Sequence, residues 1–283
     1  HLTRHMNLKS IGISNFKAFG KELQTVPIKP ITLVFGPNSA GKSSLIHSLL
    51  WLHHATTRGE TDVFHPTLSG EAVNLGGFEQ CLNRKSGEQR LKISLTMENE
   101  IPVLEPAGWR LNASTFRLEL HFGRILRDKD PTLVSCDLYA DEQLLLRCWT
   151  CNAEKSWVEA KVEWGHPSLG GIIPQHEIEE HASFAEYRLH CNGMMPSHIE
   201  LDVDGPGGLL MNAKIESLGV AFSFLAKELP EQFAEIFTGF NSVMEGMQYL
   251  PPLREIPKRE MDLRSCKLPG WRWIDKNPSL VKR

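Results

Sequence analysis

Two short alternating segments open the chain, and a continuous apolar run follows them. Residues 7–14 (NLKSIGIS) and 21–28 (KELQTVPI) predict two strands around a turn at residues 18–20. Residues 31–35 (ITLVF) are almost entirely apolar, which is typical of a strand buried on both faces. A glycine-containing loop then leads into residues 42–57, where apolar side chains recur with helical spacing. The amino-terminal part of the chain therefore predicts a strand, a loop and an amphipathic helix in direct succession. The apolar positions of that helix are Leu45, Ile46, Leu49, Leu50 and Leu52.

Short alternating segments dominate the middle of the chain. Between about residues 91 and 163 these segments are LKISLTM, TFRLELHF, TLVSCDLYA, QLLLRCW and WVEAKVEW. Because turn signals and no helical patterns separate them, they predict an antiparallel sheet. Residues 186–203 have a pattern compatible with two more strands, whereas residues 58–90 follow no sustained period and predict a long surface excursion.

The carboxy-terminal part reads as helical and then proline-rich. Residues 213–228 and 230–247 predict two helices separated by Pro230, and the segment YLPPLREIPKR follows at residues 249–259. The expected fold is a mixed α/β sheet core with an antiparallel β subdomain and a carboxy-terminal helical segment. In domain terms, residues 1–5 are expected to be a tag or cloning remnant, and 6–283 one lobe. That lobe divides into a core that holds the glycine-containing loop at 6–60, a strand-rich insert at 61–210, and helices with a basic proline-rich loop at 211–283.

Composition fits a globular protein and excludes several classes. Of 283 residues, 41% are hydrophobic and 23% are charged, so collagen-like and disordered chains are excluded. The net charge of −3 hides basic ends around an acidic middle, so a site for a polyanion is expected to use the termini. Six cysteines without an export signal, and no apolar run of membrane-spanning length, predict a cytoplasmic protein that does not enter the membrane.

The strongest motif in the sequence is a phosphate-binding loop. Residues 36–43 (GPNSAGKS) match G-x-x-x-x-G-K-[ST] at every fixed position, between the predicted strand and the predicted helix. Glycines let several backbone N–H groups point at one phosphate, and the helix adds its positive amino end. Lys42 suits the β- and γ-phosphates of ATP, and the Ser43 hydroxyl suits Mg²⁺. The candidate site for ATP comprises Gly36, Pro37, Asn38, Ser39, Ala40, Gly41, Lys42, Ser43 and Ser44.

The motifs also carry a family resemblance. ISNFKAF followed by ITLVFGPNSAGKSSLIHSLLWL resembles the amino-terminal lobe of ABC-type ATPases of the SMC, Rad50 and RecF kind. Residues 67–88 (TLSGEAVNLGGFEQCLNRKSGE) and 249–259 resemble a narrower group, the AAA/OLD-like antiphage defence ATPases, which include the PtuA-type ATPases of Septu and retron systems. The resemblance covers residues 6–97 and 248–283 and is weak in the strand-rich middle.

This resemblance implies an ATPase that regulates another protein. It implies a homodimer or higher oligomer formed through ATP, acting as sensor and gate for a nuclease effector in phage defence. A complex with a reverse transcriptase and nucleic acid, and a contact with DNA, are further implied partners. Two alternatives stay open: a RecF- or Rad50-like DNA repair ATPase, and a structural module that holds ATP with little turnover.

Two further residues are candidates for nucleotide contacts through the same resemblance. Lys17, in Asn15-Phe16-Lys17, occupies the position from which such ATPases reach the phosphates opposite the P-loop; otherwise it is a solvated turn lysine. Gln80, in GGFEQCLNR, is the candidate for the glutamine that contacts Mg²⁺ or water; otherwise it is a surface residue.

An acidic motif for hydrolysis is not recognisable. ABC-like ATPases place Asp-Glu after an apolar strand, and neither residues 136–142 (CDLYADE) nor 101–106 (IPVLEP) fit that pattern. The signature loop is also unrecognised, since LSGE at 68–71 and SLGG at 168–171 read better as turns. The catalytic residues therefore stay unknown, and we expect the chain to be an amino-terminal portion whose ATPase activity belongs to the complete protein.

Two remaining clusters carry weaker signals. Cys148 and Cys151 form a C-x-x-C that His190 and Cys191 could complete as a zinc set, but one such pair is weak evidence and no metal beyond Mg²⁺ is expected. The second cluster consists of Arg254, Lys258 and Arg259 in a proline-braced segment. We expect these cations to contact a partner protein or nucleic acid rather than only solvent.

Overall fold

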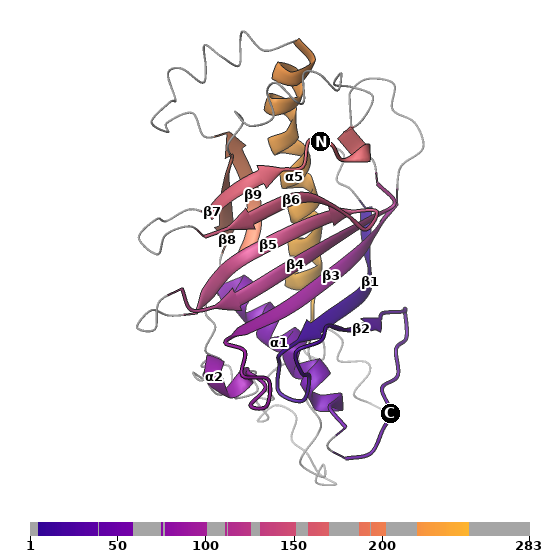
Figure 1. The fold of residues 1–283 in the computed structure, drawn as a ribbon. Helices are drawn as coiled ribbons and strands as arrows, with labels where there is room; N and C mark the ends of the chain where they lie inside the picture. Colours follow the sequence, from indigo (N-terminus) through magenta and orange to yellow (C-terminus); the bar gives the residue numbers. More distant parts are fainter. Residues whose placement is uncertain are drawn as a thin grey trace, which may run out of the picture.

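A nine-stranded sheet dominates the computed structural model, in the order β2-β1-β3-β4-β5-β6-β7-β8-β9 (Figure 1). The structure describes residues 5–38, 40–58, 75, 77–100, 111, 113–125, 131–150, 158–169, 187–192, 194–201 and 220–248. Every strand pairing among these residues is antiparallel. The strands are β1 (His5–Ser14), β2 (Gln24–Pro27), β3 (Arg90–Glu100), β4 (Thr115–Gly123), β5 (Thr132–Ala140), β6 (Gln143–Trp149), β7 (Val158–Val162), β8 (Tyr187–Asn192) and β9 (Met195–Leu201).

One long helix covers one face of this sheet. Helix α5 (Val220–Glu245) lies behind the strands in Figure 1 and packs against both β9 and β1, which are far apart in the strand order. The sheet therefore curves around the helix. At Gly239 the helix approaches β1 closely, since an added Cβ would lie 2.6 Å from Sδ of Met6. Among the side chains of α5 that the structure describes, the buried ones are Leu229, Phe233, Ile236, Phe237, Phe240 and Met244.

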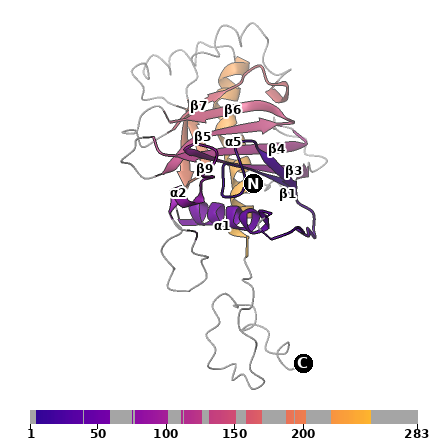
Figure 2. The same cartoon turned by 60° about the horizontal axis from the view of Figure 1, so that its bottom comes forward.

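Helix α1 (Lys42–Arg58) packs on the same side, at one end of the sheet (Figure 2). Its main anchor is Trp51, which is fully buried and lies edge-on to Phe122 of β4, with ring centroids 4.9 Å apart. Trp51 also contacts Phe78 in the short helix α2 (Phe78–Cys81), and His53 Nδ1 lies 2.7 Å from the backbone oxygen of Met244 in α5. A single 3-10 turn, η1 (Pro167–Leu169), follows β7. Among the described helices, none combines the length and the apolar character that crossing a bilayer would need.

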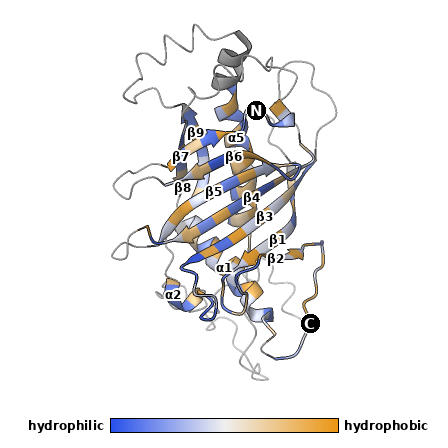
Figure 3. Cartoon of the chain, in the orientation of Figure 1, coloured by the Kyte–Doolittle hydropathy of each residue, from blue (hydrophilic) through white to orange (hydrophobic). Residues whose placement is uncertain are grey.

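The predicted fold class is confirmed: an α/β chain with a large antiparallel sheet and a carboxy-terminal helix. The strands expected at 7–14 and 21–28, the five between 91 and 163, the two within 186–203 and the helix at 42–57 are all present. Hydrophobic and polar residues alternate along the strands, which Figure 3 shows as alternating colours, and this alternation explains why the strands could be predicted from the sequence. The finer division into a P-loop core, an insert and a helical part stays a prediction.

Two expectations differ from the structure. The pair of helices around Pro230 is one continuous helix, because buried residues on both sides of the proline, Leu229 and Phe233, hold both halves on the sheet. Residues 31–35 form no strand, and Phe35 is 83% exposed. After Pro27 the chain leaves the sheet through a local turn, in which Thr32 Oγ1 accepts from the N–H of Lys29 and donates to its carbonyl oxygen. Among the described residues no strand pairs with this apolar run, so it lies exposed.

Candidate functional site

The phosphate-binding loop lies between this exposed run and the first turn of α1. Gly36 and Gly41 have φ angles of +152° and +88°, a region that side-chain-bearing residues rarely adopt. At Gly41 an added Cβ would also lie 3.3 Å from Cβ of Ala18, so the loop contacts the turn after β1. The Gly41 carbonyl already accepts a hydrogen bond from the N–H of Leu45, which joins the loop to the helix. The two fixed glycines of the motif thus have backbone conformations that a side chain would disfavour.

Lys42 is engaged by the loop itself. Its Nζ donates hydrogen bonds to the carbonyl oxygens of Gly36, at 2.7 Å, and Pro37, at 2.6 Å. The side chain therefore folds back onto the first two residues of the loop. The next residue, Ser43, is exposed in the first turn of α1, whereas Ser44 is buried. The Ser43 hydroxyl, an oxygen ligand beside the positive helix end, has the chemistry and the access that Mg²⁺ with a bound phosphate needs.

A clamp of hydrogen bonds holds the segment Asn15-Phe16-Lys17 against residues 81–90. Asn15 is 1% exposed, with φ of +56°, and its Nδ2 donates to the carbonyl oxygens of Glu88, at 2.9 Å, and Arg90, at 2.7 Å. Its Oδ1 accepts a short hydrogen bond from Ser86. Asn83 Nδ2 completes the clamp by donating to the Lys17 carbonyl oxygen at 2.7 Å.

This clamp was missed by the sequence reasoning, which considered only Lys17 of the three residues. A signal was present: asparagine directly after a strand tolerates the left-handed region better than most residues. The second side of the clamp, at Asn83 and Ser86, had no local signal, because it lies some 70 positions along the chain.

Lys17, in the turn after β1, lies close enough to helix α1 to influence a side chain of that helix. It is half-buried, and its positive charge helps to lower the pKa of His47 in α1, although burial of the imidazole is the larger cause. Because Ala18 contacts Gly41, the turn that carries Lys17 borders the loop. The role of Lys17 as a phosphate contact stays a prediction.

Gln80, the second candidate for a nucleotide contact, lies on the surface. It is exposed on α2, one turn of helix that packs under α1 through Phe78. Its neighbour Glu79 forms an ion pair with Arg124 at 2.8 Å. The Gln80 side chain therefore faces solvent in this structure, and its role stays a prediction.

The remaining candidates lie apart from this site or outside the described residues. Cys148 is buried beside Cys136, its register partner on β5, and a hydrogen bond from Cys148 together with burial raises the pKa of the Cys136 thiol. Within the described part of the chain, no group of three or more histidine, cysteine or acidic residues could hold a metal ion. Ser39 and Cys151, and the basic residues Arg254, Lys258 and Arg259, lie outside the described residues.

Comparison with known proteins finds a family model that matches the segment carrying the loop. Residues 10–114 match a model described as an AAA domain, so this segment is similar to that family. The chain is also 34% identical over 91 residues to the Old nuclease of Escherichia phage P2. That match covers 31% of this chain but only 15% of the relative.

Two solved structures are also similar to part of the chain. One comes from work on ATP-driven dimerization and DNA-stimulated activation of SMC ATPases. It is 13% identical in sequence, with a TM-score of 0.29, and the match covers 48% of this chain and 70% of that one. The other is the recombination mediator protein RecF, 14% identical with a TM-score of 0.27, where 51% of this chain covers 29% of it. At these TM-scores neither structure bears on the fold.

Proposed function

We propose that this chain binds ATP with Mg²⁺ at Gly36–Ser44, and that the complete protein is an ABC-like ATPase that controls a nuclease effector in antiphage defence in the cytoplasm. The observation that carries the proposal is the loop geometry: two glycines at positive φ precede a lysine at the amino end of a helix anchored by Trp51. Backbone N–H groups at such a position form a site for phosphate.

Binding requires Lys42 to exchange partners. Its ammonium group now satisfies two loop carbonyls, and a β- or γ-phosphate offers it oxygens with full negative charge instead. The turn that carries Lys17 borders the same loop through Ala18, and we propose that Lys17 supplies a second cation to the phosphates. When bound, Mg²⁺ would neutralise phosphate charge, and Ser43 would hold it through its hydroxyl oxygen.

Hydrolysis needs an acidic group to orient water, and the sequence has no recognisable acidic motif for that role. Among the described residues, Glu79 pairs with Arg124, and Glu88 pairs with Lys21 at 2.9 Å. We therefore propose that these 283 residues bind ATP but turn it over slowly, and that efficient hydrolysis belongs to the complete protein. Pairing of two copies through ATP is part of the same proposal and rests on the sequence resemblance.

The link to a nuclease is supported by the relative that is 34% identical to this chain over 91 residues, which is itself named a nuclease. In cells, protection against phage should then depend on ATP binding. Plating efficiency of phage on cells that express the complete protein should rise to the unprotected level with Lys42→Ala. Full protection by that variant would contradict the dependence of defence on ATP binding, whereas no protection by the wild type would contradict the defence proposal and leave the ATP-binding proposal unaffected.

The direct test of binding is a calorimetric titration of the chain with MgATP. Lys42→Ala should lower the affinity by about a hundredfold, because it removes charge-assisted contacts to two phosphates. The matched control is Lys85→Ala, an exposed lysine outside the loop, which should leave affinity unchanged. Equal affinity of the wild type and Lys42→Ala would contradict the proposed site.

A further inference from the structure

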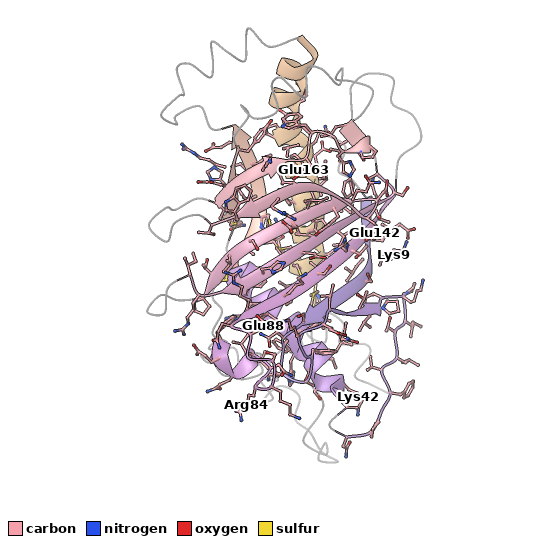
Figure 4. The ribbon with its side chains drawn as sticks, viewed as in Figure 1. Lys9, Lys42, Arg84, Glu88, Glu142 and Glu163 are labelled. Carbon is pink, nitrogen blue, oxygen red and sulfur yellow. The ribbon has the colours of Figure 1, made fainter. Side chains whose placement is uncertain are left out.

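A hollow of about 420 Å³ lies on the outer face of the sheet, over β2, β1, β3 and β4. No residue of the loop at 36–44 lines it, and Figure 4 shows its residues Lys9 and Glu142 at one edge of the sheet, well away from Lys42. Its size is in the range typical of small-molecule sites. Five of its lining residues carry hydroxyl groups: Ser10, Thr25, Ser94, Thr96 and Thr115.

Strand register explains why these hydroxyls share one face. Thr96 of β3 pairs with Ser10 of β1 on one side and with Arg117 of β4 on the other. In the next row, Ser94 pairs with Gly12, which pairs in turn with Thr25. The residues that alternate with them, such as Ile11 and Leu95, are buried in the core on the face of α5.

Several polar groups in the hollow are not used by the protein. Ser94 and Thr96 are only 2% and 8% exposed, yet their hydroxyl groups make no hydrogen bond to another described residue. Lys9 and Lys29 are exposed at the rim, and neither ammonium group has a carboxylate partner within the described residues. Hydroxyl groups that line a hollow and make no hydrogen bond to the described residues can bind water or a ligand.

The charge of the hollow favours an anion. Arg117 is already held by Glu119 and by Glu142, the latter through an Nε–Oε2 contact of 3.2 Å. The two lysines at the rim therefore remain as uncompensated cations. Glu142 also offers carboxylate oxygens that can accept hydrogen bonds from ligand hydroxyls.

We propose that this hollow binds a small phosphorylated molecule rich in hydroxyl groups, such as a sugar phosphate. Lys9 and Lys29 would hold the phosphate, and the serine and threonine hydroxyls with Glu142 would bind the hydroxyl groups. A nucleic-acid strand fits less well. Its phosphates would need a continuous series of cationic side chains along the outer face, and the acidic pair Glu119 and Asp137, on β4 and β5 beside the hollow, interrupts such a series. No aromatic ring lines the hollow for a base to stack on.

The test uses ribose 5-phosphate as the probe and Lys42→Ala as the background, so that the loop cannot contribute phosphate binding. Calorimetry or ligand-observed NMR should detect binding, tighter than that of inorganic phosphate because the hydroxyls add contacts. Lys9→Ala together with Lys29→Ala should weaken binding by about tenfold or more, and Thr96→Val by about threefold. The matched control is Lys161→Ala, an exposed lysine of the same face in β7, which should change nothing.

Three results would overturn the assignment. The first is no binding of ribose 5-phosphate at about 10 mM, a concentration that reveals even weak affinity. The second is an equal loss in Lys161→Ala, which would indicate unspecific attraction to the face. The third is binding of a labelled oligothymidylate, lost with Lys9 and Lys29, without binding of the sugar phosphate. Circular dichroism of each variant establishes that the sheet is intact.

Discussion

The sheet with α5 and the segment that leads to the P-loop differ in what holds them. Ladder hydrogen bonds and a buried core define the sheet, where Phe116, Leu118 and Leu120 are fully buried in β4 alone. Residues 31–35 are as apolar as a core strand, yet Ile31 and Phe35 are 80% and 83% exposed and pair with no described strand. Apolar sequence alone therefore does not place a segment in a sheet; a neighbour with free backbone groups must be available as well.

The P-loop owes its position to α1 and to the turn after β1. Trp51 fixes α1 in the core, Gly41 contacts Ala18, and the clamp at Asn15 holds that turn. The loop is thus supported on its helix side and exposed on its strand side. Substitutions in the packed supports should therefore cost far more stability than substitutions in the loop.

Removal of the α1 anchor should have the largest effect. Trp51→Ala should lower the free energy of unfolding by about 3–5 kcal/mol, because it leaves a cavity against Phe122 and Phe78. Urea unfolding followed by circular dichroism measures it. Ile46→Ala is the control on the same helix; at 43% exposure it should cost about 0.5 kcal/mol or less. Equal costs would show that Trp51 does not anchor α1.

Loosening the clamp should come next. Asn15→Ala should cost about 3 kcal/mol, since it leaves buried backbone carbonyls unpaired and places alanine at φ of +56°. Asn15→Gly relieves the backbone strain but not the lost hydrogen bonds, so it should cost less than Asn15→Ala. If glycine were the more costly substitution, the conformational part of this explanation would be wrong.

Acid should weaken the sheet through His121 of β4. Burial lowers its pKa to about 4, and the neighbouring Lys92 contributes to the shift, whereas an unfolded histidine titrates near pH 6.5. Between these values the unfolded chain binds more protons, so stability falls as the pH falls through this window. From pH 7 to pH 5 the loss assigned to His121 is about 1.5 kcal/mol, and His121→Gln should remove it. An unchanged pH dependence in that variant would contradict the assignment.

The smallest expected change in stability comes from the loop itself. Gly41→Ala puts a side chain at φ of +88° against Ala18, so MgATP affinity should fall by about tenfold. The free energy of unfolding should fall by only about 1 kcal/mol, because the exposed loop can shift to relieve the strain. Gly87→Ala, also at positive φ but in open space, is the control and should not alter affinity. A large loss of global stability in Gly41→Ala would mean that the loop belongs to the cooperative core.

Local sequence patterns predicted most of the strands and helices, but they could not predict contacts between segments far apart in the sequence. Alternation identified β3 to β9 because one face is buried and the other polar, and the loop motif was readable from fixed positions. The curvature of the sheet around α5, the contact of Trp51 with Phe122 and the pairing of Asn15 with residues 86–90 depend on segments far apart in sequence. For the same reason, the exposure of 31–35 and the continuity of α5 through Pro230 could not be read from the sequence.

Hydrogen–deuterium exchange with and without MgATP tests the central contrast most directly. Amides of residues 31–41 should exchange fast in the free chain while those of β4 are protected, and MgATP should slow exchange at 36–44 alone. Lys42→Ala should abolish that slowing and leave β4 unchanged. Protection of 31–35 equal to that of β4 in the free chain, or no response of the loop to MgATP, would contradict the account.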